Sequence, residues 1–234
     1  MRQIILDTET TGLNPKNGDR IIEIGCIELV HRRPTGNTFH RYVNPGRDSE
    51  PGAYAVHGLS TDFLSDKPPF SEIAEALRVF VAGAEVLIHN AAFDLAFLDE
   101  EFARLSLAAF RGHCLSVIDT LAMAKELHPG KRNSLDALCE RYGVSNAHRT
   151  LHGALLDAEL LADVYLAMTR GQESLVIDIA PRRSVQDVAR QVDRSALRVL
   201  RADVEELTQH AALLESIARE SKAQPVWMLH KSEN

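Results

Sequence analysis

The chain of 234 residues has few cysteines, a single tryptophan and no long apolar run. Its three cysteines, Cys26, Cys114 and Cys139, are odd in number, widely spaced and set among apolar residues, which is typical of reduced thiols and does not indicate a zinc site. No stretch reaches the roughly 18 apolar residues that cross a bilayer, and residues 1–3 lead directly into an apolar run without a signal-type leader. We therefore expect a cytoplasmic protein without a membrane partner.

The chain also lacks an excess of positive charge, because 26 basic residues face 33 acidic ones and the net charge is −7. A protein that holds nucleic acid by phosphate neutralisation alone is expected to be strongly basic. If the acidic part of this chain acts on a phosphodiester, metal ions must offset the repulsion between its carboxylates and the phosphates. Another protein chain must then supply much of the affinity for the nucleic acid.

Apolar periodicity and turn-forming residues predict a mixed α/β sheet flanked by helices. The opening is antiparallel, since residues 34–37 form a turn-forming cluster between the second and third strands, and a β-α-β pattern follows. The expected strands are residues 3–7, 20–30, 38–43, 86–88 and 114–118. The expected helices run from a Ser71 cap to Gly83, from Asp94 through Leu105, from a Ser134 cap to Tyr142, and from Gly153 to Arg170.

The character of the sequence changes after Gly171, which predicts three regions. Residues 1–171 form a compact domain, residues 172–183 a linker, and residues 184–234 a helical tail. The two helical patterns of the tail have no sheet to pack on, so they favour a partner protein.

Four acidic residues are candidates for a metal site. Asp7 and Glu9 end an apolar strand and face the same side, because side chains alternate along a strand. Asp157 interrupts a helix rich in Leu and Ala, where a carboxylate needs a partner. Asp94 opens a helix, which by itself is more often a favourable charge at the helix dipole. Buried carboxylates are costly without a cation, and hard oxygen ligands suit Mg²⁺ or Mn²⁺.

His152 precedes Asp157 by five residues, which rotate a helix by about 500° and leave the two side chains about 140° apart. Both can face one site if His152 lies at or before the start of the helix. Histidine is the commonest base near neutral pH, and a capping or core histidine is the alternative interpretation.

The order Asp-x-Glu, Asp, His-x₄-Asp resembles the DEDD exonuclease superfamily, histidine branch, which implies a ribonuclease H-like fold. Longer stretches resemble the proofreading subunits of bacterial DNA polymerase III, densely over about residues 2–175 and more loosely to the C terminus. These stretches are residues 6–12, 89–94, 130–139 and 149–158.

The resemblance implies a 3′-to-5′ exonuclease that releases nucleoside 5′-monophosphates one at a time from single-stranded or mispaired DNA 3′ ends. It implies that Asp7, Glu9, Asp94 and Asp157 hold two divalent ions, Mg²⁺ or Mn²⁺, about 4 Å apart. It also implies that His152 takes the proton from the attacking water.

Three further residues are expected at the terminal nucleotide. Thr10 and Leu13 would pack the last sugar and base, and His57 matches a substrate-pocket histidine of the family. Relatives often carry an acidic residue five positions before that histidine, where this chain has Gly52. Asp119 is better interpreted as the cap of the following helix than as a site residue.

Residues 172–177 resemble a sliding-clamp binding peptide, in which Gln172 anchors by hydrogen bonds and Leu175 fills a groove. A simple linker is the alternative. The tail resembles the part of the family that binds the polymerase catalytic subunit, and such tethering raises the effective concentration of the domain at a primer end. Whether a small accessory subunit also binds stays open.

Two other functions fit the same residues. An RNA 3′ exonuclease is one, because the catalytic set does not itself sense the 2′-hydroxyl, although the tail argues against it. A non-catalytic adaptor between polymerase and clamp is the other, and the intact set of five candidate residues argues against it.

Overall fold

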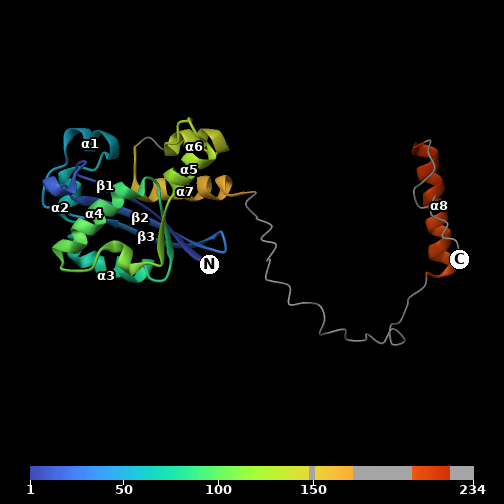
Figure 1. Cartoon of the computed structure of the whole chain (residues 1–234), viewed down its shortest axis with the longest axis horizontal. Coiled ribbons are helices and arrows are strands. Elements are labelled where there is room, and N and C mark those ends of the chain that lie inside the picture. Colours follow the sequence, from blue (N-terminus) through green and yellow to red (C-terminus); the bar gives the residue numbers. More distant parts are fainter. Residues whose placement is uncertain (148–150, 171–201, 222–234) are drawn as a thin grey trace, which may run out of the picture. The chain divides into compact units, whose positions relative to one another are not determined.

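The computed structural model describes residues 1–147, 151–170 and 202–221 (Figure 1). Its contacts divide the chain into two compact units, Met1–Val176 and Ile177–Asn234. Each unit is described by itself.

A five-stranded mixed sheet with the order β3-β2-β1-β4-β5 forms the centre of the first unit. β1 pairs antiparallel with β2 and parallel with β4, and β4 pairs parallel with β5. The antiparallel opening and the β-α-β continuation are therefore confirmed. The strands are β1 (Arg2–Thr10), β2 (Ile21–Val30), β3 (Arg33–Tyr42), β4 (Glu85–Ile88) and β5 (Ser116–Asp119).

Helices cover both faces of this sheet, as the alternation of side chains along β1 requires. Ile4 and Leu6 pack in one hydrophobic cluster with α3 (Phe70–Val81) and α4 (Ala91–Arg104). Ile5 packs in the other with α6 (Leu135–Tyr142) and α7 (Ala154–Met168). In Figure 1, α3 lies below the sheet and α6 above it. The predicted mixed α/β sheet with flanking helices is confirmed.

Several expected helix ends agree with the structure. The Ser134 hydroxyl accepts a hydrogen bond from Ala137 N at 3.3 Å and caps α6, which ends before Gly143. The Asp119 carboxylate accepts from the amides of Leu121 and Ala122, so it caps α5 (Thr120–Leu127) as expected. The periodicity argument did not predict the two short helices α1 (Pro51–His57) and α2 (Thr61–Ser65) or the 3₁₀ turns at Pro15–Asn17 and Phe110–His113.

The expectation of a turn at residues 34–37 is wrong. The turn is the pair His31-Arg32, whose φ angles are 50° and 62°, and Pro34 already lies in β3. β3 is an edge strand, where a residue without an N–H group is tolerated. A register shift opposite Ile27 and Leu29 accommodates the extra residues.

Three other element starts differ from the expectations. α4 begins at Ala91, so Asp94 lies within its first turn instead of opening the helix. The N-cap of α3 is Pro69 instead of Ser71, and the first helical residue, Phe70, is fully buried. β5 begins at Ser116 instead of Cys114. At the start of α3, the packing of Phe70 on the core overrides the local preference for a serine cap.

The described part of the second unit is α8 (Val204–Ser221). Its residues Val204, Leu207 and Leu213 are more than half exposed. None of the helices among the described residues is long and apolar enough to span a membrane. The expected helix around Val185–Val199, and the peptide with Gln172 and Leu175, lie outside the described residues.

Candidate active site

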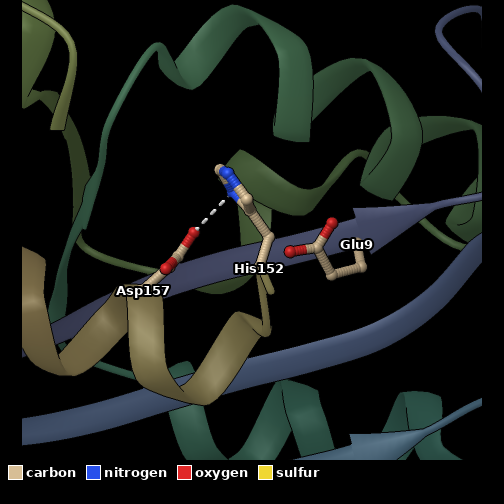
Figure 2. A group of neighbouring side chains, drawn as sticks. All are labelled: Glu9, His152 and Asp157. Carbon is tan, nitrogen blue, oxygen red and sulfur yellow. Dashed lines mark hydrogen bonds and ion pairs between the residues drawn. The ribbon is translucent and has the colours of Figure 1, made fainter. Parts of the chain in front are cut away.

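Glu9, His152 and Asp157 converge on one point, and each offers a ligand atom within 4.8 Å of the other two (Figure 2). Glu9 comes from the end of β1, Asp157 from the first turn of α7, and His152 from the segment just before α7. His152 Nδ1 lies 3.2 Å from Asp157 Oδ2. His152 therefore precedes the helix, as the rotation argument required.

The segment before α7 is fixed to α1. The amide of His152 donates to the carbonyl oxygen of Val56 at 3.1 Å, and the space above Gly58 is filled by the Leu151 side chain. The amide of Asp157 donates to Gly153 O at 2.9 Å, which continues the helix geometry. These contacts hold His152 over a carboxylate that α7 presents.

Asp94 is 4% exposed and lies in the first turn of α4. Thr8, which faces the opposite side of β1 from Asp7 and Glu9, donates from its hydroxyl to Asp94 Oδ1 at 2.7 Å. Burial raises the pKa of Asp94 to about 7, although the hydrogen bond from Thr8 opposes that shift. A carboxyl group in such a place gains stability when a cation neutralises it.

Asp7 lines the same cavity as His152 and Asp157. Neither Asp7 nor Asp94 belongs to the group of three residues whose ligand atoms lie within 4.8 Å of one another. Asp94 is linked to the end of β1 through its hydrogen bond with Thr8. The structure thus brings three of the five candidate residues together. Asp7 lines a cavity with two of them, and Asp94 is hydrogen-bonded to Thr8, which lies between Asp7 and Glu9 in β1. Shared metal coordination by all four carboxylates stays a prediction.

Two cavities meet the end of β1. A cavity of about 460 Å³ contains Asp7, His152 and Asp157 in its lining, and a second of about 430 Å³ contains Glu9. Because Glu9 lies within 4.8 Å of His152 and Asp157, the three-residue group stands between the two cavities. The second cavity is lined mainly by apolar atoms, and Thr10, Leu13 and His57 all line it.

His57 is 3% exposed, and its Nδ1 accepts from the amide of Leu59 at 2.9 Å. Burial lowers the pKa of His57, which favours the neutral ring with its proton on Nε2. Among the described residues, Nε2 has no hydrogen-bond partner. A donor in this state suits a polar group of a ligand.

Several residues that line the two cavities were not predicted from the sequence. Phe93 and Glu50 line the second cavity. Glu50 stands two positions before Gly52, the position at which relatives often carry an acidic residue. Lys125 and Lys131 line the first. Phe93 and Lys131 lie in two of the family-like stretches, residues 89–94 and 130–139, which is a usable signal, whereas Lys125 lies outside them.

Comparisons with known proteins agree with this geometry. A family model described as Exonuclease matches residues 4–165. DNA polymerase III subunit epsilon of Pasteurella multocida is 48% identical over 97% of this chain and 93% of its own length. The same subunit of Escherichia coli K12 is 48% identical over 93% of this chain and 94% of its own.

Solved structures show the same fold at lower identity. Exonuclease X in complex with 5′ overhanging duplex DNA has a TM-score of 0.57 at 24% identity, over 72% of this chain and 92% of its own. Exonuclease I (apo) has a TM-score of 0.63 at 19% identity, over 72% of this chain and 42% of its own.

The sheet order, the acidic group with its histidine and the family model together define an exonuclease domain of the ribonuclease H-like fold. The identities over nearly the whole chain are more specific. The chain belongs to the family of DNA polymerase III epsilon subunits.

Proposed function

We propose that the chain is a 3′-to-5′ exodeoxyribonuclease that proofreads for DNA polymerase III and releases nucleoside 5′-monophosphates. The observation that carries the proposal is the group of Glu9, His152 and Asp157, because it places an acidic ligand set and a base between two cavities. The membership of the epsilon family supplies the assembly in which the reaction takes place.

The donor set fits two divalent ions. Asp157 and Glu9 are at least nine-tenths buried, and Asp94 has a pKa raised by burial, so added positive charge stabilises all three. Asp7, Glu9, Asp94 and Asp157 offer the hard oxygen ligands that Mg²⁺ and Mn²⁺ prefer. The chemistry that such ions supply is acidification of the attacking water and neutralisation of charge on the leaving 3′ oxygen.

His152 takes the proton from the attacking water. Its ring is 43% exposed, so a water molecule can reach it, and its Nδ1 contact with Asp157 orients the ring. A proton on Nδ1 leaves the lone pair of the neutral ring on Nε2, which is the form that accepts a proton.

The terminal nucleoside occupies the second cavity. Leu13 and Phe93 offer apolar surface to the base and sugar, Thr10 lines the same wall, and His57 Nε2 offers a donor. A cavity of about 430 Å³ suits one nucleoside.

Partners of two kinds complete the proposal. The tail with α8 binds the catalytic subunit of the polymerase in the cytoplasmic replisome of a bacterium, and Gln172 and Leu175 bind the sliding clamp weakly. The exposed apolar residues of α8 support the first contact. A small accessory subunit is compatible with the proposal and is not required by it.

Digestion of oligonucleotides by the purified protein tests the function. We expect Mg²⁺- or Mn²⁺-dependent release of nucleoside 5′-monophosphates from single-stranded and mispaired DNA 3′ ends, and complete loss of release with EDTA. Matched RNA oligomers are the control for the sugar. Faster degradation of RNA would favour an RNA exonuclease, and no turnover with either metal would leave a non-catalytic adaptor.

A further inference from the structure

Lysines are rare in residues 1–170, and half of them line one cavity. Residues 1–170 contain four lysines, Lys16, Lys67, Lys125 and Lys131. Two of them, Lys125 and Lys131, line the cavity that also contains Asp7 and Asp157. These two cationic side chains therefore lie beside candidate metal-binding carboxylates, in a chain whose net charge is −7.

Hydrogen bonds of Asn133 fix the loop that carries Lys131. The buried Asn133 donates from Nδ2 to the carbonyl oxygens of Lys131 and His128. The Asn133 carbonyl lies 3.0 Å from His89 Nε2, and its side-chain oxygen accepts from Arg141 Nη1 at 3.0 Å. The backbone of this loop is therefore fixed against β4 and α6.

Lys125 comes from the other border of the same cavity, on α5. The Asp119 cap fixes the start of this helix, and Ala124 packs its buried face on the core. Both lysines are exposed, although the backbone that carries each of them is fixed by these contacts. Asp136 also lines the cavity, and its carboxylate accepts from Asn146 Nδ2 at 3.1 Å, so the wall is not uniformly cationic.

We infer that Lys125 and Lys131 bind the phosphates of the retained DNA strand, immediately 5′ to the bond that is cut. This inference rests on the proposed function, which puts the terminal nucleoside in the second cavity and the scissile phosphate at the carboxylates. The remainder of the strand must then leave the group of Glu9, His152 and Asp157 through the first cavity.

The charges favour this assignment. A strand that crosses Asp7 and Asp157 brings further phosphates into a field of the same sign, so it needs fixed cations beyond the ion-binding carboxylates. Lysine is a flexible point charge that contacts phosphate without reading bases. A sequence-independent contact is what an enzyme requires when it removes any terminal nucleotide.

The test compares two substrates that differ in whether they have a retained strand. One is a single-stranded DNA oligomer, and the other is the p-nitrophenyl ester of thymidine 5′-monophosphate. We expect Lys125→Gln and Lys131→Gln to raise the KM for the oligomer several-fold at low salt and to leave the kcat and KM for the ester unchanged. Each lost phosphate contact should reduce the slope of log KM against log salt by about 0.7.

Three control variants sharpen the result. Lys125→Arg and Lys131→Arg keep the charge and should restore the oligomer KM. Lys67→Gln removes a lysine that lines neither cavity and is paired with Asp66 at 2.7 Å, so it should change neither the KM nor the salt slope.

Three outcomes would overturn the inference. The first is an oligomer KM and a salt slope equal to those of the unsubstituted protein. The second is an equal loss on both substrates, which would place the lysines at the reacting phosphate. The third is an altered inhibition constant for thymidine 5′-monophosphate, which would make the wall a product site. If the unsubstituted protein lacks metal-dependent turnover of both substrates, the proposed function itself fails, and this inference fails with it.

Discussion

At the scale of single residues, the site contains groups that are more stable with a ligand than without one. The Asp94 carboxyl group is enclosed in protein, and the hydrogen bond from Thr8 offsets its burial in part. His57 has a donor without a partner among the described residues. Such groups lower the stability of the free protein and are satisfied when metal or substrate binds.

We predict that Asp94→Asn stabilises the metal-free protein and removes its activity. Burial raises the pKa of Asp94 from 3.8 to about 7, so the cost of its charge is absent below the lower value, grows between the two, and is complete above pH 7. The difference in Tm between variant and unsubstituted protein should therefore increase across this pH window. A stabilisation of 1 kcal/mol corresponds to about 2–4 °C.

Calorimetry in EDTA between pH 4 and pH 8 (roughly the window set by these pKa values) measures this difference. Asp62→Asn, at an exposed position in α2, is the matched control and should show no such pH dependence. A variant that is less stable than the unsubstituted protein at pH 8 would contradict the account of Asp94.

A second prediction concerns His152→Ala. Removal of a general base typically slows the reaction by about 10²- to 10⁴-fold, and we expect a loss in that range with Mn²⁺ binding retained. Steady-state hydrolysis of a short DNA oligomer and calorimetric titration with Mn²⁺ measure the two properties. His210→Ala, in α8, is the control. Near-normal turnover would remove His152 from the role of base.

At the scale of elements, the site depends on how closely α7 approaches the sheet. Gly25 of β2 pairs with Asp7 of β1, and a Cβ atom on Gly25 would lie 2.3 Å from backbone atoms of Ala154 and Leu155. The first turn of α7, which carries Asp157, can lie at this depth because residue 25 has no side chain.

We predict that Gly25→Ala lowers both stability and activity. The clash is with backbone, which cannot rotate away, so α7 must shift and move Asp157 relative to Glu9. Overpacking of this kind costs about 1–3 kcal/mol, and a shift of the ligands should reduce kcat strongly. Thermal unfolding and oligomer hydrolysis measure the effects. Gly112→Ala is the control, because a Cβ atom there meets Ala108 Cβ at an ordinary 3.7 Å. Unchanged kcat in the Gly25 variant would contradict the argument.

The elements also show how far the sequence determines the site. The alternation along β1 and the rotation between His152 and Asp157 follow from local geometry. The placement of His152 before the start of α7 is confirmed, whereas the shared orientation of Asp7 and Glu9 stays a prediction. α1 was not predicted because its one buried residue is His57, so it has no apolar period. Lys125 and Lys131 were missed because the sequence pattern does not show that α5 and the loop before α6 line one cavity with Asp157, although Lys131 lies within the family-like stretch 130–139.

At the scale of the whole molecule, the distribution of charge predicts a division of labour. We expect a catalytic unit with a net negative charge to bind DNA weakly by itself and to depend on partners that hold it at the primer end. The first unit contains both hydrophobic clusters, whereas the described helix of the second unit, α8, has no buried residue.

We predict that Gln172→Ala and Leu175→Ala weaken binding to the sliding clamp and leave the hydrolysis of short oligomers unchanged. Both residues follow α7 in the chain, and none of the five candidate catalytic residues lies among residues 172–177. Surface plasmon resonance with immobilised clamp measures the affinity, with Glu173→Ala as the control. Unchanged clamp affinity in both variants would rule out the peptide.

The central claim is that Asp7, Glu9, Asp94 and Asp157 hold two divalent ions beside His152. Anomalous diffraction from crystals grown with Mn²⁺ and thymidine 5′-monophosphate tests it most directly. We expect two anomalous peaks, together coordinated by oxygen atoms of all four carboxylates. Peaks that leave Asp7 or Asp94 without a metal contact, or no peak at this end of β1, would contradict it.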